Sequence, residues 1–141
     1  MFNDSFNRCG CRPEGIGDIR EGIRDIAGGI SECRVGLNDI INCRIRQGTR
    51  ECIVGVRNCE EGLGDIIDGL RDIRFRGNGE GIRDIERGIR EVRAGDKLVL
   101  EGVADVLQNR IREGQRDIAQ GIRLQQRGLA NIIEGFRDIR R

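Results

Sequence analysis

Residues 81–94 read GIRDIERGIREVRA, two copies of a seven-residue unit that begins with glycine and carries aliphatic residues at its second and fifth positions. The aliphatic residues are therefore three and four residues apart in alternation. This spacing is that of a coiled-coil helix and not of a β-strand. The consensus unit, Gly-Ile-Arg-Asp-Ile-x-x, thus predicts a helix with one apolar stripe and with its charged residues on the opposite side.

The same unit occupies nearly all of the 141-residue chain, in sets of four. The sets begin at Gly15, Gly48, Gly81 and Gly114, so the larger repeat is 33 residues long. The sequence predicts an all-α fold of four helices of about 28 residues, packed as antiparallel, coiled-coil-like hairpins in a four-helix array. The expected joints are 43–47, 76–80 and 109–113, and the four repeats of the helical domain (15–141) are 15–47, 48–80, 81–113 and 114–141.

One continuous helix is the alternative to separate helices. Thirty-three residues over nine turns give about 3.67 residues per turn, which corresponds to a slight right-handed supercoil. However, Arg76-Gly77-Asn78-Gly79-Glu80 is typical of a turn. The sequence therefore favours four helices joined by short connections.

The composition argues against several functional classes. The 25 basic and 24 acidic residues nearly cancel, whereas nucleic-acid binding requires a strongly basic surface. The chain has no histidine, tyrosine or tryptophan, and its only hydroxyl side chains are those of Ser5, Ser31 and Thr49. Few side chains are therefore available to act as nucleophiles or as general acids and bases. We therefore expect no enzymatic activity, no catalytic residues, no cofactor and no small-molecule substrate.

Membrane association is not expected either. The longest apolar stretches, such as Leu98-Val99-Leu100, are far too short to span a bilayer. The balanced charges and the scarcity of aromatic anchors argue against a helix that lies on a lipid surface. Residues 1–10 lack both an apolar run and a basic leader, so we expect no secretory signal peptide. An extracellular location would then require an unconventional route or earlier processing.

The glycine that opens each unit is an energetically costly choice. Inside a helix, glycine costs about 1 kcal/mol relative to alanine. The regular spacing indicates a compensating role in which another backbone approaches the glycine closely. The glycines either tighten an internal four-helix bundle or face outward and pack against neighbouring subunits. The sixteen residues concerned are Gly15, Gly22, Gly29, Gly36, Gly48, Gly55, Gly62, Gly69, Gly81, Gly88, Gly95, Gly102, Gly114, Gly121, Gly128 and Gly135.

Four of the six cysteines lie in the first two repeats. If these repeats form an antiparallel hairpin, the pairs Cys33–Cys59 and Cys43–Cys52 share a midpoint near residues 46–47. This common midpoint predicts two intrachain disulfides. The alternative is that the thiols are small buried residues in a reducing cell. With no histidine and no C-x-x-C pair in the chain, a metal site is not expected.

The other two cysteines, Cys9 and Cys11, lie in residues 1–14, which we expect to form a flexible tail. They are well placed to form cross-links between subunits. We therefore expect a structural protein that polymerises with itself into an extracellular or surface filament or coat, cross-linked by disulfides. The cysteine-containing, repetitive sequence resembles, by analogy only, cross-linked fibres on bacterial cells or spores. The alternative is a soluble helical scaffold or binding module that does not polymerise.

Overall fold

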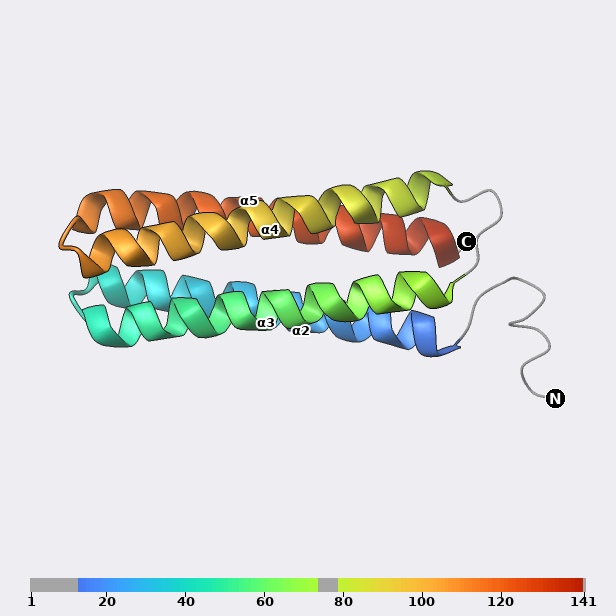
Figure 1. The fold of residues 1–141 in the computed structure, drawn as a ribbon, viewed down its shortest axis with the longest axis horizontal. Coiled ribbons are helices and arrows are strands. Elements are labelled where there is room, and N and C mark those ends of the chain that lie inside the picture. The colour runs from blue at the N-terminus through green and yellow to red at the C-terminus, as the bar shows by residue number, and fades with distance from the viewer. Residues whose placement is uncertain (1–12, 74–78, 141) are drawn as a thin grey trace.

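The computed structural model describes residues 13–73 and 79–140, which form four long helices of 28 to 30 residues. The predicted all-α fold of four helices is confirmed for these residues, and they contain no strand. The alternative of one continuous helix is wrong, because residues 42–44 and 108–110 lie outside the helices. The helices are α2 (Pro13–Ile41), α3 (Ile45–Asp72), α4 (Gly79–Leu107) and α5 (Ile111–Arg140) (Figure 1).

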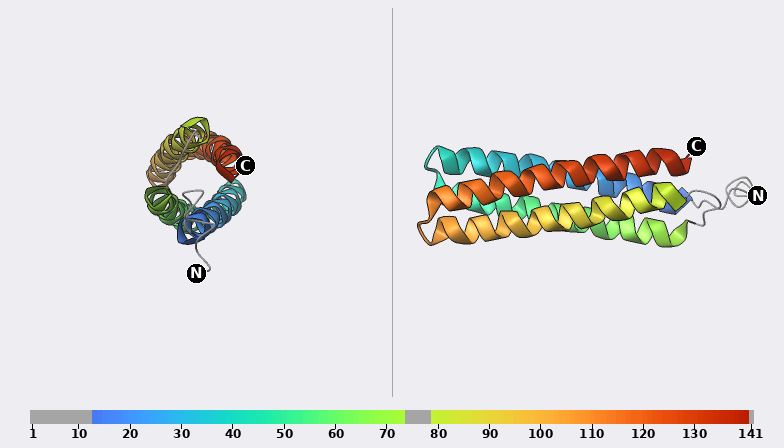
Figure 2. Two further views of the ribbon diagram at one scale, coloured as in Figure 1. Left: turned by 90° about the vertical axis from the view of Figure 1, so that its right-hand side faces the viewer. Right: turned by 90° about the horizontal axis from the view of Figure 1, so that it is seen from above.

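The four helices form a rod made of two antiparallel hairpins. Helices α2 and α3 form hairpin A, and helices α4 and α5 form hairpin B (Figure 1). Viewed end-on, the helices form a ring in which α2 lies beside α5 and α3 lies beside α4 (Figure 2). The two tight turns, at 42–44 and 108–110, lie together at one end of the rod, which we call the turn end. The opposite end, where α2 begins and α3 ends, is the tail end.

The two tight turns have the same structure. In the first, Cys43 adopts a left-handed backbone conformation with φ of 66°. The Arg44 amide donates a hydrogen bond to the Asp39 carbonyl at 2.7 Å, as in the common glycine-type helix terminus. The Arg44 guanidinium also binds the Asp39 carboxylate at 2.7 Å. The second turn repeats this arrangement 66 residues later, so that Asn109 corresponds to Cys43, Asp105 to Asp39 and Arg110 to Arg44.

The connections differ in detail from the predicted joints. Each tight turn has only three residues, and the following helix begins at Ile45 or Ile111, within the expected joint. Both isoleucines are partly buried and pack against the hydrophobic core. Their burial extends the helix by a turn toward its N-terminus. Of the middle predicted joint, 76–80, residues 76–78 lie outside the described residues, and helix α4 already begins at Gly79.

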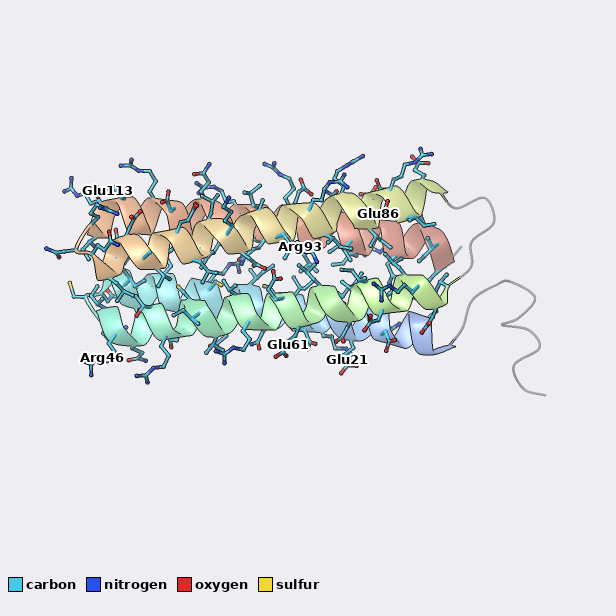
Figure 3. All side chains as sticks on the ribbon, viewed as in Figure 1. Glu21, Arg46, Glu61, Glu86, Arg93 and Glu113 are labelled. Carbon is cyan, nitrogen blue, oxygen red and sulfur yellow. The ribbon has the colours of Figure 1, made fainter. Side chains whose placement is uncertain are left out.

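The core is built from the two apolar positions of each seven-residue unit, which have different neighbours. Side chains at the fifth position lie against the glycines of the paired helix in the same hairpin, and each is at most 5% exposed. Side chains at the second position, such as Leu70, Ile82 and Ile89, lie between the two hairpins. Several of these, including Leu70 and Ile82, are only partly buried. Charged side chains such as Glu21 and Glu61 are exposed on the outside of the rod (Figure 3).

Candidate functional site

The sixteen repeated glycines form a continuous contact inside each hairpin, which we call the glycine seam. All sixteen are buried, and each lies opposite a glycine of the paired helix. A Cβ atom added to any of them would lie 2.9 Å or less from the carbonyl oxygen of the opposite glycine. The glycines therefore allow the two backbones to touch. They are used within the chain and are not available to neighbouring subunits, which rules out the outward-facing alternative for these residues.

The contact between Gly29 and Gly55 illustrates the geometry. A Cβ on Gly29 would lie 2.5 Å from the Gly55 carbonyl oxygen and 2.7 Å from Sγ of Cys59. In return, a Cβ on Gly55 would meet the Gly29 carbonyl oxygen and Sγ of Cys33. Each fifth-position side chain thus occupies the space that glycine leaves open on the opposite helix.

The register of hairpin A differs from the one that the cysteine spacing predicted. Opposite glycines, such as Gly29 and Gly55, have their midpoint at residue 42, four or five residues before the expected 46–47. As a consequence, Cys33 lies opposite Cys52, and each thiol points to the other residue's carbonyl oxygen, with S···O distances of 3.7 and 3.8 Å.

The four described cysteines are free thiols, and neither predicted disulfide, Cys33–Cys59 or Cys43–Cys52, is present among them. Cys43 is exposed in the turn, whereas Cys52 is buried against Gly36 on α2, well inside hairpin A. The turn lies at the true midpoint of the hairpin, so Cys43 has no partner across it. Cys9 and Cys11 lie outside the described residues.

A cluster of polar side chains crosses the middle of the core, and we call it the polar layer. It consists of Cys33 and Cys59 from hairpin A and Asp96 and Gln125 from hairpin B. All four residues are at most 4% exposed. The Gln125 amide nitrogen donates a hydrogen bond to the Asp96 carboxylate at 2.8 Å and contacts Sγ of Cys33 at 3.8 Å. The second oxygen of Asp96 and the amide oxygen of Gln125 are buried without a partner.

Burial alters the acidity of every titratable group in the polar layer. It raises the pKa of Asp96 to about 9, and a hydrogen bond shared with Glu60 contributes to this shift. Asp96 is therefore protonated and neutral at pH 7. Burial also raises the pKa of Cys33 to about 12 and raises that of Cys59. The layer is thus uncharged near neutral pH, and its thiols are poor nucleophiles.

A pair of carboxyl groups lies near the first tight turn. The hydrogen bond between Asp39 and Glu51, followed by that from Arg44, lowers the pKa of Asp39. The same shared hydrogen bond raises the pKa of Glu51. The lowered pKa keeps Asp39 ionised, which suits its ion pair with Arg44 at the turn.

The large exposed apolar side chains of the described residues are confined to the turn end. We call this group the turn-end patch, and all of its members lie within eight residues of a helix terminus at a tight turn. Leu107 is 64% and Ile41 is 55% exposed. The full set is Val35, Ile41, Ile53, Leu100 and Leu107.

Shallow apolar grooves lie along the junctions between the hairpins. Near the tail end, a groove of about 340 Å³ between α3 and α4 is lined by Ile67, Leu70, Ile82 and Ile89, with Arg71 and Glu86 beside them. We call it the tail-end groove. Two further grooves, of about 290 and 350 Å³, lie between α2 and α5. Packing between hairpins is therefore looser than packing within them.

The repeat and the cysteine spacing pointed to the glycines and cysteines but not to Asp96 and Gln125. A signal was available, because these residues stand at the second and fifth positions of their units, where most units have an aliphatic residue. The sequence did not show that they meet, since this depends on how the hairpins pack. The described residues contain no group of three or more histidine, cysteine or acidic side chains that could hold a metal ion.

Within residues 13–73 and 79–140, no helix is both long and apolar enough to cross a membrane. Comparison of this chain with protein-family models, curated proteins and solved structures finds no match.

Proposed function

We propose that this protein is a structural subunit that stacks end to end into a filament or coat and is then locked by disulfides between subunits. The observation that carries the proposal is that the large exposed apolar side chains of the described residues are confined to the turn end of the rod. The turn-end patch offers protruding apolar side chains, and the tail-end groove offers an apolar depression at the other end.

Contact between these two surfaces would join unlike ends of successive subunits. Such a contact repeats without closing when no rotation brings it back to the first subunit, and it then produces an open filament. Burial of Ile41 and Leu107 would supply part of the driving force, because both are more than half exposed in the single rod.

The covalent lock would join Cys9 or Cys11 of one subunit to Cys43 of the next. Cys43 is exposed at the turn end, whereas the other three described thiols are buried. Each cross-link forms one S–S bond from two thiols, and the two protons and two electrons pass to a small-molecule disulfide, which is released as two thiols. This chemistry fits an oxidising location such as a cell or spore surface.

The test compares variants by sedimentation and negative-stain microscopy, with oxidised glutathione or with excess thiol. We expect the unmodified protein to form filaments under both conditions and to resist hot detergent only after oxidation. Cys9→Ser with Cys11→Ser should leave the filaments but remove this resistance. Ile41→Glu with Leu107→Glu should abolish the filaments.

A matched control separates the loss of apolar surface from the added negative charge. Arg46→Gln with Gln108→Glu makes the same net charge change at the turn end while preserving the turn-end patch, and both residues are exposed. This variant should still assemble. If the control and the Ile41/Leu107 variant behave alike, the turn-end patch is not the contact.

The second candidate is a soluble scaffold that does not polymerise. All sixteen repeated glycines lie in contacts within the chain, so the most regular surface of the helices is not available to bind another subunit. This observation favours the scaffold. A single small species at high concentration, without filaments in either redox condition, would establish the scaffold and overturn the filament.

A further inference from the structure

The two hairpins present each other with surfaces of the same design. Hairpin B repeats hairpin A after 66 residues, in the glycine seam and in the turn. On apolar pattern alone, hairpin A pairs as well with another hairpin A as with hairpin B. Some feature must favour the observed combination of A with B, because the repeated pattern cannot.

Within the core, the two hairpins differ most in polarity at the polar layer. Counting 66 residues between equivalent positions, Gln125 of hairpin B corresponds to Cys59 of hairpin A, and Asp96 corresponds to Ile30. At these two positions hairpin A thus carries a thiol and an isoleucine, and hairpin B carries a longer amide and a smaller carboxyl group. In the structure, Gln125 fills the space beside Cys33 and Asp96 lies near Cys59.

The other two combinations lack this match in size and polarity. Two B hairpins would place Val99 and Gln125 where Cys33 and Cys59 lie, which overfills a close-packed core and adds buried polar atoms. Two A hairpins would place Cys59 where Gln125 lies, which leaves empty volume beside Cys33, and the larger Ile30 where Asp96 lies, which crowds Cys59. Buried polar contacts are known to select one pairing among several similar ones, even where they add little stability.

We propose that the polar layer selects the pairing of hairpin A with hairpin B, and that a second copy of this chain can provide the complementary hairpin by reciprocal exchange. The partner is therefore this protein itself, and the interaction surface is the junction between the hairpins. The proposal does not rest on the filament, because it uses neither the turn-end patch nor Cys9, Cys11 or Cys43.

The unequal packing of the rod supports exchange of whole hairpins. Within a hairpin the backbones touch along the glycine seam, so we expect each hairpin to separate from the other as one unit. Between hairpins, side chains make the contact and three grooves remain open. The junction between hairpins is therefore the surface along which the rod separates most readily.

The test exchanges the identities of the two hairpins in full-length chains. Variant 1 gives hairpin A the polar residues of hairpin B, through Ile30→Asp and Cys59→Gln. Variant 2 gives hairpin B the residues of hairpin A, through Asp96→Ile and Gln125→Cys. Variant 3 carries all four substitutions, so that the identities are reversed but still complementary within one chain. The control, Ile26→Val with Val92→Ile, exchanges equivalent residues in an apolar part of the core.

We expect variants 1 and 2 to unfold at lower denaturant concentration than the unmodified protein, whereas variant 3 recovers most of the loss and the control loses less stability than either variant 1 or variant 2. After variants 1 and 2 are refolded together in excess thiol, native mass spectrometry should show a mixed dimer about tenfold in excess over either homodimer. If one variant fails to fold alone, recovery of its helical circular dichroism on mixing provides the same evidence.

Two results would overturn the proposal. One is a variant 3 that is no more stable than variants 1 and 2, which would show that the hairpins do not recognise each other through this layer. The other is a refolded mixture without an excess of mixed dimer, which would show that a second copy does not supply the complementary hairpin. Because reductant is present throughout, neither result depends on the disulfide lock of the proposed filament.

Discussion

The adjacent glycines Gly28 and Gly29 provide a direct test of the glycine seam, because alanine should have opposite effects at the two positions. Gly28 is exposed, and a Cβ added there has no neighbour within 4 Å. A Cβ on Gly29 would lie 2.5 Å from the Gly55 carbonyl oxygen, 2.7 Å from Sγ of Cys59 and 2.9 Å from the Cys59 amide nitrogen. The two sites share one helix, so the difference between them reports packing and not helix propensity.

The expected magnitudes follow from these surroundings. Gly28→Ala should raise the free energy of unfolding by about 1 kcal/mol, the helix-propensity difference between the two residues. Gly29→Ala gains the same amount but overfills the contact, which costs about 3 kcal/mol, the upper end of the usual range, because backbone atoms yield only if the whole helix moves. The net loss is about 2 kcal/mol, so the two variants should differ by about 3 kcal/mol, or about 10 °C in Tm.

Chemical denaturation monitored by circular dichroism at 222 nm, under reducing conditions, measures both effects. A third variant extends the test across the hairpin. Gly55→Ala alone should cost as much as Gly29→Ala, but the two together should cost less than their sum, because one alanine already separates the helices. A Gly29→Ala protein at least as stable as Gly28→Ala would refute the backbone contact described for the seam.

Three further predictions concern the turn and the polar layer. Cys43→Gly should stabilise the protein by about 0.5–1 kcal/mol in thermal unfolding, because Cys43 has φ of 66°, and Asn109→Gly should gain less because asparagine tolerates this conformation better. The free energy of unfolding should fall as the pH rises from about 4 to about 9, because the folded state keeps Asp96 protonated where the unfolded state ionises it. The fall should be at most about 1.4 kcal/mol per pH unit, and Asp96→Asn should remove it in urea titrations at several pH values. At pH 8 a thiol reagent followed by mass spectrometry should modify Cys43 at least about a hundredfold faster than the three buried cysteines, unless local opening exposes them.

The sequence predicted the architecture because each level of the pattern has one structural meaning. Apolar residues three and four apart specify a helix, and glycine every seventh residue specifies a close contact with another backbone. The same pattern placed the first tight joint only to within a few residues. Ile45 lies in the predicted joint but packs against the core. The sequence does not determine whether an apolar residue just outside the repeat belongs to the helix before it or to the helix after it.

The cysteine pairing was mistaken because spacing along a chain does not determine the register of a hairpin. A common midpoint for two cysteine pairs is compatible with more than one register, and the glycines provide a stronger constraint. Only glycine opposite glycine lets the backbones touch, as at Gly36 and Gly48, and this condition places the midpoint at residue 42. Applied to the sequence, it would have placed Cys43 in the turn and Cys33 opposite Cys52.

The polar layer was beyond sequence reasoning for a different reason. A regular repeat determines how neighbouring helices pair, but it leaves the choice between hairpins open because every hairpin repeats the same spacing of glycines and apolar residues. That choice depends on residues that depart from the repeat, such as Asp96 and Gln125. The role of such a residue cannot be inferred until the residues that surround it in the structure are known. Two polar atoms remain without partners in this layer, on Asp96 and Gln125. Burying polar atoms without partners lowers the stability of the folded protein, and aliphatic residues at these positions would remove this cost. The layer is therefore better explained by selection of a partner than by stability.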